Sequence, residues 1–140
     1  MKRKFNRVYF PALLCTIAFF SADCKKSNSA AAPPHRSVVG YWVGKFADGG
    51  ATPTNGFAFL FRPNGTVRVY DDQDTASGSA TEGTYALTDS TVTTTYSNGG
   101  AYGPYNTVGV LNSTSTQISG SWGDGGTNYN GGIFYLDKVQ

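Results

Sequence analysis

From Val38 onward, hydrophobic and polar residues alternate with a period of two in short runs that are separated by turn signals. Such alternation indicates β-strands with one buried and one wet face, because successive side chains of a strand point to opposite sides. No stretch carries apolar residues with helical spacing over three turns, so the pattern favours an all-β domain. The expected strands are 38–47, 55–62, 66–71, 81–87, 91–97, 105–111, 115–122 and 132–139.

The connections between these runs are of two kinds. Pro63-Asn64-Gly65 predicts a tight hairpin, and 88–90 and 112–114 are short polar turns. Longer loops rich in Gly, Asp and Asn are expected at 48–54, 72–80, 98–104 and 123–131. Sequentially joined antiparallel strands of this kind form either an up-and-down barrel or a β-sandwich.

The alternation places the large aromatic residues on one face. In several strands they alternate with glycine, as in Gly40/Trp42/Gly44/Phe46 and Gly120/Trp122, and small residues beside large ones suit the interior of a small barrel. We therefore expect an eight-stranded antiparallel barrel, with the sandwich as the alternative. The inner-face aromatics would be Trp42, Phe46, Phe57, Phe59, Phe61, Tyr85, Tyr96, Trp122 and Tyr135.

The amino-terminal residues have a different pattern. Basic residues before position 8 precede an uncharged, largely apolar run at 8–20, which is shorter than the approximately 20 residues that span a bilayer. This arrangement predicts a secretory signal over 1–23. Ser21-Ala22-Asp23-Cys24 resembles the lipobox of bacterial lipoproteins, and Cys24-Lys25-Lys26-Ser27 is similar to lipoproteins of Bacteroidetes-type bacteria. The resemblance implies lipidation of Cys24; an ordinary signal with an incidental thiol is the alternative.

Cysteine usage agrees with this expectation. Cys15 lies inside the apolar run, so Cys24 would be the lone thiol of the mature chain and could form no intramolecular disulfide. Residues 24–37 are small and polar and contain Pro33 and Pro34, which predicts a flexible tether. The tether contains His35, the only histidine, which we interpret as part of a solvated spacer.

The domain 38–140 resembles the lipocalins. Gly40-Tyr41-Trp42 is similar to their Gly-x-Trp signature, in which the Trp plugs the closed end of the barrel. The segments 61–67, 83–87, 120–122 and 132–138 are similar to strands of small lipocalin-like bacterial lipoproteins. Because the domain is short, its interior could hold a ligand cavity or be filled by side chains.

Charge limits the classes of partner. The chain has a formal net charge of +2, but from Val38 onward four basic residues face eight acidic ones, which gives 4 − 8 = −4. A basic surface for nucleic acid is therefore not expected in the domain.

The sequence offers little catalytic chemistry. No Ser–His or Cys–His pair is available in the domain, no zinc-type cluster exists, and neither a cofactor nor a metal is expected. The acidic segment 71–82 spaces Asp71 and Glu82 like the ends of a calcium-binding loop, but its intermediate positions do not fit. We interpret it as a solvated loop, with weak calcium binding as the alternative, and we do not expect an enzyme.

These patterns predict a membrane-anchored, non-catalytic lipoprotein of the cell envelope that binds a small hydrophobic or amphipathic ligand. The expected location is the periplasmic or surface face of the outer membrane. The residues expected to line the ligand site are Trp42, Phe57, Phe59, Tyr85, Tyr96, Trp122 and Tyr135. The alternative is a filled barrel that binds an envelope protein through Tyr102, Tyr105, Tyr129 and Asn130. An inner void of about 300 Å³ or more, open at one end, would favour the ligand.

Overall fold

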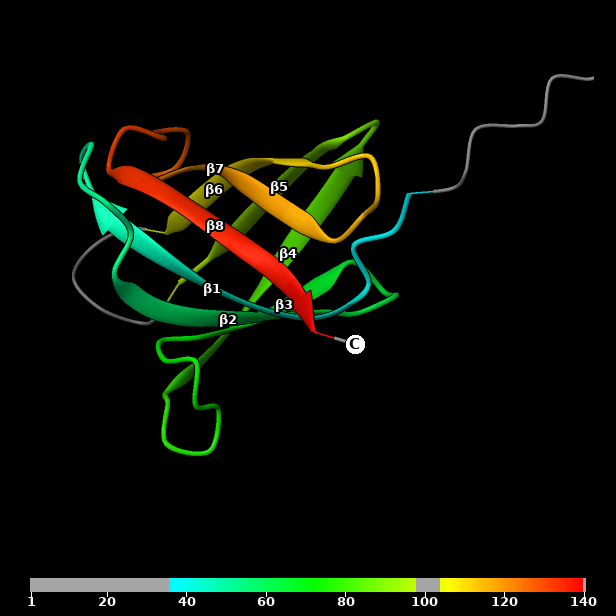
Figure 1. Ribbon diagram of the computed structural model, residues 1–140, viewed down its shortest axis with the longest axis horizontal. Coiled ribbons are helices and arrows are strands. Elements are labelled where there is room, and N and C mark those ends of the chain that lie inside the picture. Colours follow the sequence, from blue (N-terminus) through cyan, green and yellow to red (C-terminus); the bar gives the residue numbers. More distant parts are fainter. Residues whose placement is uncertain (1–35, 98–103, 140) are drawn as a thin grey trace, which may run out of the picture. The chain divides into compact units, whose positions relative to one another are not determined.

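The computed structural model describes residues 36–97 and 104–139, and every regular element in these ranges is a β-strand (Figure 1). The strand bounds agree with the expected runs to within a few residues. The strands are β1 (Gly40–Asp48), β2 (Asn55–Phe61), β3 (Thr66–Tyr70), β4 (Ala80–Thr88), β5 (Thr91–Tyr96), β6 (Tyr105–Leu111), β7 (Gln117–Asp124) and β8 (Gly132–Val139).

The strands form a closed antiparallel barrel in which each strand pairs with its neighbour in sequence. Closure is made by β1 and β8, which pair from Tyr41 with Val139 to Asp48 with Gly132. The expected up-and-down barrel is therefore confirmed, and the sandwich alternative is wrong. Closure leaves no strand edge unpaired, which is how such barrels avoid edge-to-edge association.

The two ends of the barrel differ in their connections. One end carries the three tight hairpins β2–β3, β4–β5 and β6–β7, whose turns place Gly65, Asp89 and Ser115 at positive φ of 80°, 56° and 57°. We call this end the closed pole; its hairpins lie on the right in Figure 1. At the other end, which we call the mouth, the longer connections 49–54, 71–79 and 125–131 follow β1, β3 and β7. β5 also ends at the mouth and β6 begins there, but residues 98–103 between them lie outside the described residues.

Trp42 fills the closed pole. Its side chain is fully buried, and its indole nitrogen donates a hydrogen bond of 2.7 Å to the carbonyl oxygen of Val38. The ring packs edge-on against Phe61 at 6.3 Å between centroids, and the Lys138 ammonium lies 5.5 Å from its centroid. Val38 was expected to begin the first strand; instead it precedes β1 and is itself 1% exposed, so it covers the end of the core.

The expected division into faces holds for β1 to β5 and for β7. Trp42, Phe57, Phe59, Phe61, Val67, Val69, Val92 and Ile118 belong to one buried cluster, against which Phe46, Tyr85, Tyr96 and Trp122 pack.

The assignment for β8 is wrong. Phe134 and Leu136 are buried, whereas Ile133 and Val139, which share a face with Tyr135, are 42% and 45% exposed. Tyr135 pairs with Lys45 of β1 and therefore lies on the outer face. All of residues 133–136 are apolar or aromatic, so alternation could not choose between the faces, and only the pairing with β1 decides.

Within residues 36–97 and 104–139, no helix is long and apolar enough to cross a bilayer. The expected signal over 1–23, Cys24 and His35 lie outside the described residues, as does Tyr102.

Candidate functional site

The mouth of the barrel opens into a cavity of about 450 Å³. Its walls come from the mouth-side ends of seven strands and from the β3–β4 connection. The lining residues are Phe46, Phe57, Val69, Tyr70, Asp71, Ser79, Ala80, Thr81, Tyr96, Tyr105 and Trp122. The interior is thus packed with side chains at the closed pole and hollow at the mouth. The short domain therefore combines the two expected alternatives, a filled interior and a cavity.

Aromatic side chains form a continuous circle of contacts around this cavity. Tyr96 and Tyr105 are stacked at 5.8 Å between centroids with an interplanar angle of 27°, and Tyr105 contacts Trp122 at 6.2 Å. Phe46 contacts Trp122 at 5.9 Å and Phe57 at 5.3 Å, both edge-on. Phe59 completes the circle, at 5.0 Å from Phe57 and 5.9 Å from Tyr96. These separations are in the range that aromatic pairs prefer.

The position of Trp122 is fixed by a hydrogen bond and by two glycines. Its indole nitrogen donates to the carbonyl oxygen of Ala47 at 3.0 Å. A Cβ at Gly132 would lie 2.7 Å from that nitrogen, and one at Gly131 would lie 2.9 Å from the far edge of the ring. Only glycine at these positions leaves room for the indole to lie across β8, so the ring is held in the cavity lining.

The floor of the cavity is apolar. Phe59, the member of the circle that does not line the cavity, is fully buried, and Phe57 packs edge-on against Phe134 at 6.0 Å. Val69 is 6% exposed and lines the same region from β3. A ligand that enters from the mouth therefore meets hydrocarbon and ring surface at its inner end.

The β3–β4 connection supplies the polar part of the wall. The backbone nitrogen of Asp71 donates to the carbonyl oxygen of Ser79 at 3.1 Å, which brings the two ends of this connection together. Gln73 packs against Gly56 and donates from Nε2 to the carbonyl oxygen of Gly44 at 2.8 Å. The loop is thereby fastened to β1 and β2, with Asp71 and Ser79 left at the cavity.

Burial also affects the ionisation of the tyrosines. It raises the pKa of Tyr96, and the neighbouring Tyr105 adds to the effect in the same direction. Burial likewise raises the pKa of Tyr85, whose hydroxyl donates to the carbonyl oxygen of Arg62 at 2.8 Å at the closed pole. Both phenols stay neutral at physiological pH, so Tyr96 lines the cavity as an uncharged side chain.

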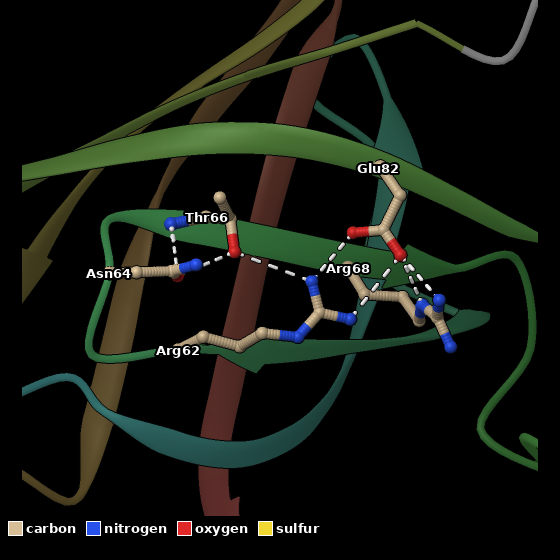
Figure 2. A network of polar contacts seen from close by, with 5 residues as sticks. All are labelled: Arg62, Asn64, Thr66, Arg68 and Glu82. Atoms are coloured by element: carbon tan, nitrogen blue, oxygen red, sulfur yellow. Dashed lines mark hydrogen bonds and ion pairs between the residues drawn. The ribbon is translucent and has the colours of Figure 1, made fainter.

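The acidic segment 71–82 does not fold as a calcium-binding loop. Glu82, expected at the far end of that alternative, lies on the outer face, where Arg62 binds it through two nitrogens at 2.7 and 3.3 Å (Figure 2). Arg68 binds the same carboxylate through Nε at 2.5 Å. Hydrogen bonds from Arg62 and then Arg68 lower the pKa of Glu82 to about 2. Asp71 lines the cavity instead, and among the described residues no group of three or more His, Cys, Asp or Glu is placed to hold a metal.

Three of the seven expected site residues line the cavity: Phe57, Tyr96 and Trp122. Phe59 lies in the circle beneath them without reaching the lining. Trp42 and Tyr85 face inward but belong to the packed closed pole. Tyr135 faces outward, so its assignment to the site is wrong.

The sequence pattern does not predict the remaining lining residues as part of a ligand site. Asp71 and Ser79 lie in the β3–β4 connection. The others lie at the mouth-side ends of β1, β3, β4 and β6: Phe46, Val69, Tyr70, Ala80, Thr81 and Tyr105. The signal that could have found them is topological. In an up-and-down barrel the connections after every second strand meet at one end, so the residues beside the longer loops share one mouth.

Neither the models of known protein families nor the curated proteins include a match to this chain.

Proposed function

We propose that this protein is an exported, non-catalytic lipoprotein whose barrel binds a small hydrophobic or amphipathic molecule. The observation that carries the proposal is the cavity at the mouth. Its volume of about 450 Å³ lies within the range of roughly 300–1,000 Å³ that is usual for small-molecule sites. Aromatic walls with a few polar groups at one side are the usual composition of such sites.

The rival function, docking of an envelope protein on a filled barrel, receives less support. Its surface was expected to include Tyr105, but this ring lines the cavity and stacks on Tyr96. Tyr129 and Asn130 remain in the 125–131 connection at the mouth. The hollow interior favours the small ligand because a docking module has no need of it.

Ligand binding is tested with the neutral fluorescent probe N-phenyl-1-naphthylamine. We expect its emission to rise on binding and the fluorescence of Trp122 to be quenched. Thr81 faces the cavity from β4, so Thr81→Trp should fill the mouth and weaken binding at least tenfold. The matched control is Thr84→Trp, which places the same side chain on the exposed face of the same strand. Equal binding by wild type and Thr81→Trp, or no binding by wild type, would refute the proposal.

The membrane anchor is proposed from the sequence motif at Cys24, and we place the protein in the cell envelope on that basis. Durable attachment needs more than a single acyl chain, and the lipobox resemblance implies several on one cysteine. Cys24→Ser should move the protein from the membrane to the soluble fraction. Mass spectrometry of the mature amino terminus checks the lipid directly, and an unmodified Cys24 would contradict the anchor.

A further inference from the structure

Among the residues that the structure describes, one charged residue lines the cavity, and it is the acidic Asp71. Asp71 follows the last residue of β3 and is positioned by its backbone bond to Ser79. One oxygen of its carboxylate would lie only 3.1 Å from a Cβ at position 78, where the chain has glycine. The fold of the β3–β4 connection therefore holds Asp71, an exposed residue, in the lining of the cavity.

The basic side chains of the described residues are engaged or directed elsewhere. Arg62 and Arg68 both bind Glu82 on the outer face. Lys138 lies over Trp42 at the closed pole. Lys45 pairs with Tyr135 on the outer face, and Arg36 precedes the barrel at the closed pole. None of these cations lines the cavity, so an anionic ligand would meet no counter-charge there.

The charged residues around the mouth are acidic, like Asp71 in the cavity lining. Asp48 and Asp124 end β1 and β7 there, and Asp72 and Asp74 lie in the β3–β4 connection. The described mouth connections 49–54, 71–79 and 125–131 contain no Lys, Arg or His. A rim of one charge sign raises the local concentration of oppositely charged ligands and repels like charges. The acidic residues at the mouth make the local electrostatic potential negative, and the cavity provides the binding site.

The aromatic walls suit the same class of ligand. Ring faces of Trp and Tyr attract ammonium groups, and cages of several rings bind quaternary ammonium compounds. Here Tyr96, Tyr105 and Trp122 form consecutive contacts of the circle and all line the cavity. Phe46 and Phe57 continue the wall toward the apolar floor.

We propose that the cavity selects an organic cation, a molecule with an ammonium group and an apolar body, with Asp71 as its counter-ion. This inference rests on the proposed function, since it names the class of ligand for the same cavity. The ammonium group would lie between the carboxylate and the ring faces, and the apolar body would extend to the floor at Phe57 and Val69.

The test measures displacement of N-phenyl-1-naphthylamine by octyltrimethylammonium, 1-octanol and octanoate, which share one alkyl chain and differ in head-group charge. We expect the cation to bind at least about tenfold more tightly than octanol, and octanoate to bind most weakly. Asp71→Asn should lower the affinity for the cation to nearly that for octanol, and it should leave the affinity for octanol unchanged. The control Asp89→Asn makes the same change of net charge at the closed pole, where asparagine tolerates the positive φ of 56°.

The outcomes separate the two proposals. If octanol or octanoate binds as tightly as the cation, or if Asp89→Asn acts like Asp71→Asn, the cation preference is wrong and the ligand-binding function stands. If neither the fluorescent probe nor any octyl compound binds, both fail. A second measurement needs no variant. Added salt should weaken binding of the cation to wild type and leave octanol unaffected, and equal salt effects on both would overturn the inference.

Discussion

The indole nitrogen of Trp122 donates a hydrogen bond of 3.0 Å to the carbonyl oxygen of Ala47, so that one side chain of β7 reaches across β8 to β1. The same ring contacts Phe46 and Tyr105 at the cavity wall. This hydrogen bond thus supports both the β1–β8 seam, the pairing that closes the barrel, and the wall of the candidate site. The space for this arrangement comes from glycine in the intervening strand.

Gly132→Ala should disturb the seam and the site together. The added Cβ would lie 1.9 Å from the carbonyl oxygen of Ala47 and 2.7 Å from the Trp122 nitrogen, so backbone and ring must move. We expect a loss of roughly 1–3 kcal/mol in the free energy of unfolding, as for other overpacked positions, and an altered Trp emission maximum. Gly50→Ala is the control, because a Cβ there meets nothing within 4 Å. Equal urea midpoints for the two variants would contradict this account.

Trp42→Phe should weaken the fold and spare the site. The substitution removes the donor to Val38, whose side chain is buried, and leaves space beside Phe61. We expect the free energy of unfolding to fall by about 2–4 kcal/mol, from an unsatisfied carbonyl and a small cavity. Trp42 does not line the mouth cavity, so probe affinity at a temperature where the variant is folded should match wild type. Reduced affinity in the folded variant would argue against separate roles for the two ends.

Glu82→Gln should lower stability at neutral pH but not in strong acid. The fold lowers the pKa of Glu82 from 4.5 to about 2, so its contribution is complete above pH 4.5 and disappears as the pH falls toward 2. Because these groups are exposed, we expect at most about 1 kcal/mol at neutral pH. Urea unfolding at several pH values measures the difference. Glu82→Gln should cause no loss of stability in a protein that already carries Arg62→Gln and Arg68→Gln. A loss that persists in that protein would exclude the ion pairs as its cause.

Tyr96→Phe should make the protein less sensitive to alkali. The fold raises the pKa of Tyr96 above its ordinary value of 10.0, so above that pH the unfolded chain loses this proton before the native state does. Stability therefore falls with rising pH, and the phenylalanine variant should show a shallower decline. Tyr135→Phe removes an outward-facing ring as the control. Parallel stability profiles for wild type and Tyr96→Phe would refute the assignment.

The barrel could be predicted from the sequence because its strands alternate clearly and its turns carry Asn, Gly and Asp at the required positions. Six strands were assigned to the correct faces by their parity. The failure at β8 has a local cause, since residues 133–136 present large side chains on both faces. There the choice depends on hydrogen-bond register with β1, which a single strand's sequence does not contain.

The candidate site could be predicted only in part. Phe57, Tyr96 and Trp122 were found because each is an inward aromatic, but so are Trp42 and Tyr85, which fill the opposite end. The alternation of residues shows which face of the sheet a side chain occupies. It does not show whether that side chain lies near the mouth or near the closed pole. Asp71 was noticed as an acid in a loop, and its place at the cavity depends on how that loop returns to Ser79. Such loop geometry arises from contacts between distant segments.

The pairing of Tyr41 with Val139, which is part of barrel closure, also determines where a fusion partner or a solid support can be joined to the domain. Residue 38 and residue 139 leave the fold together at the sealed end, beside Trp42. A fusion partner joined directly after residue 139 would therefore lie on the side remote from the opening. Immobilisation at that point leaves the entrance unobstructed, whereas a label on the 125–131 connection would lie directly at it.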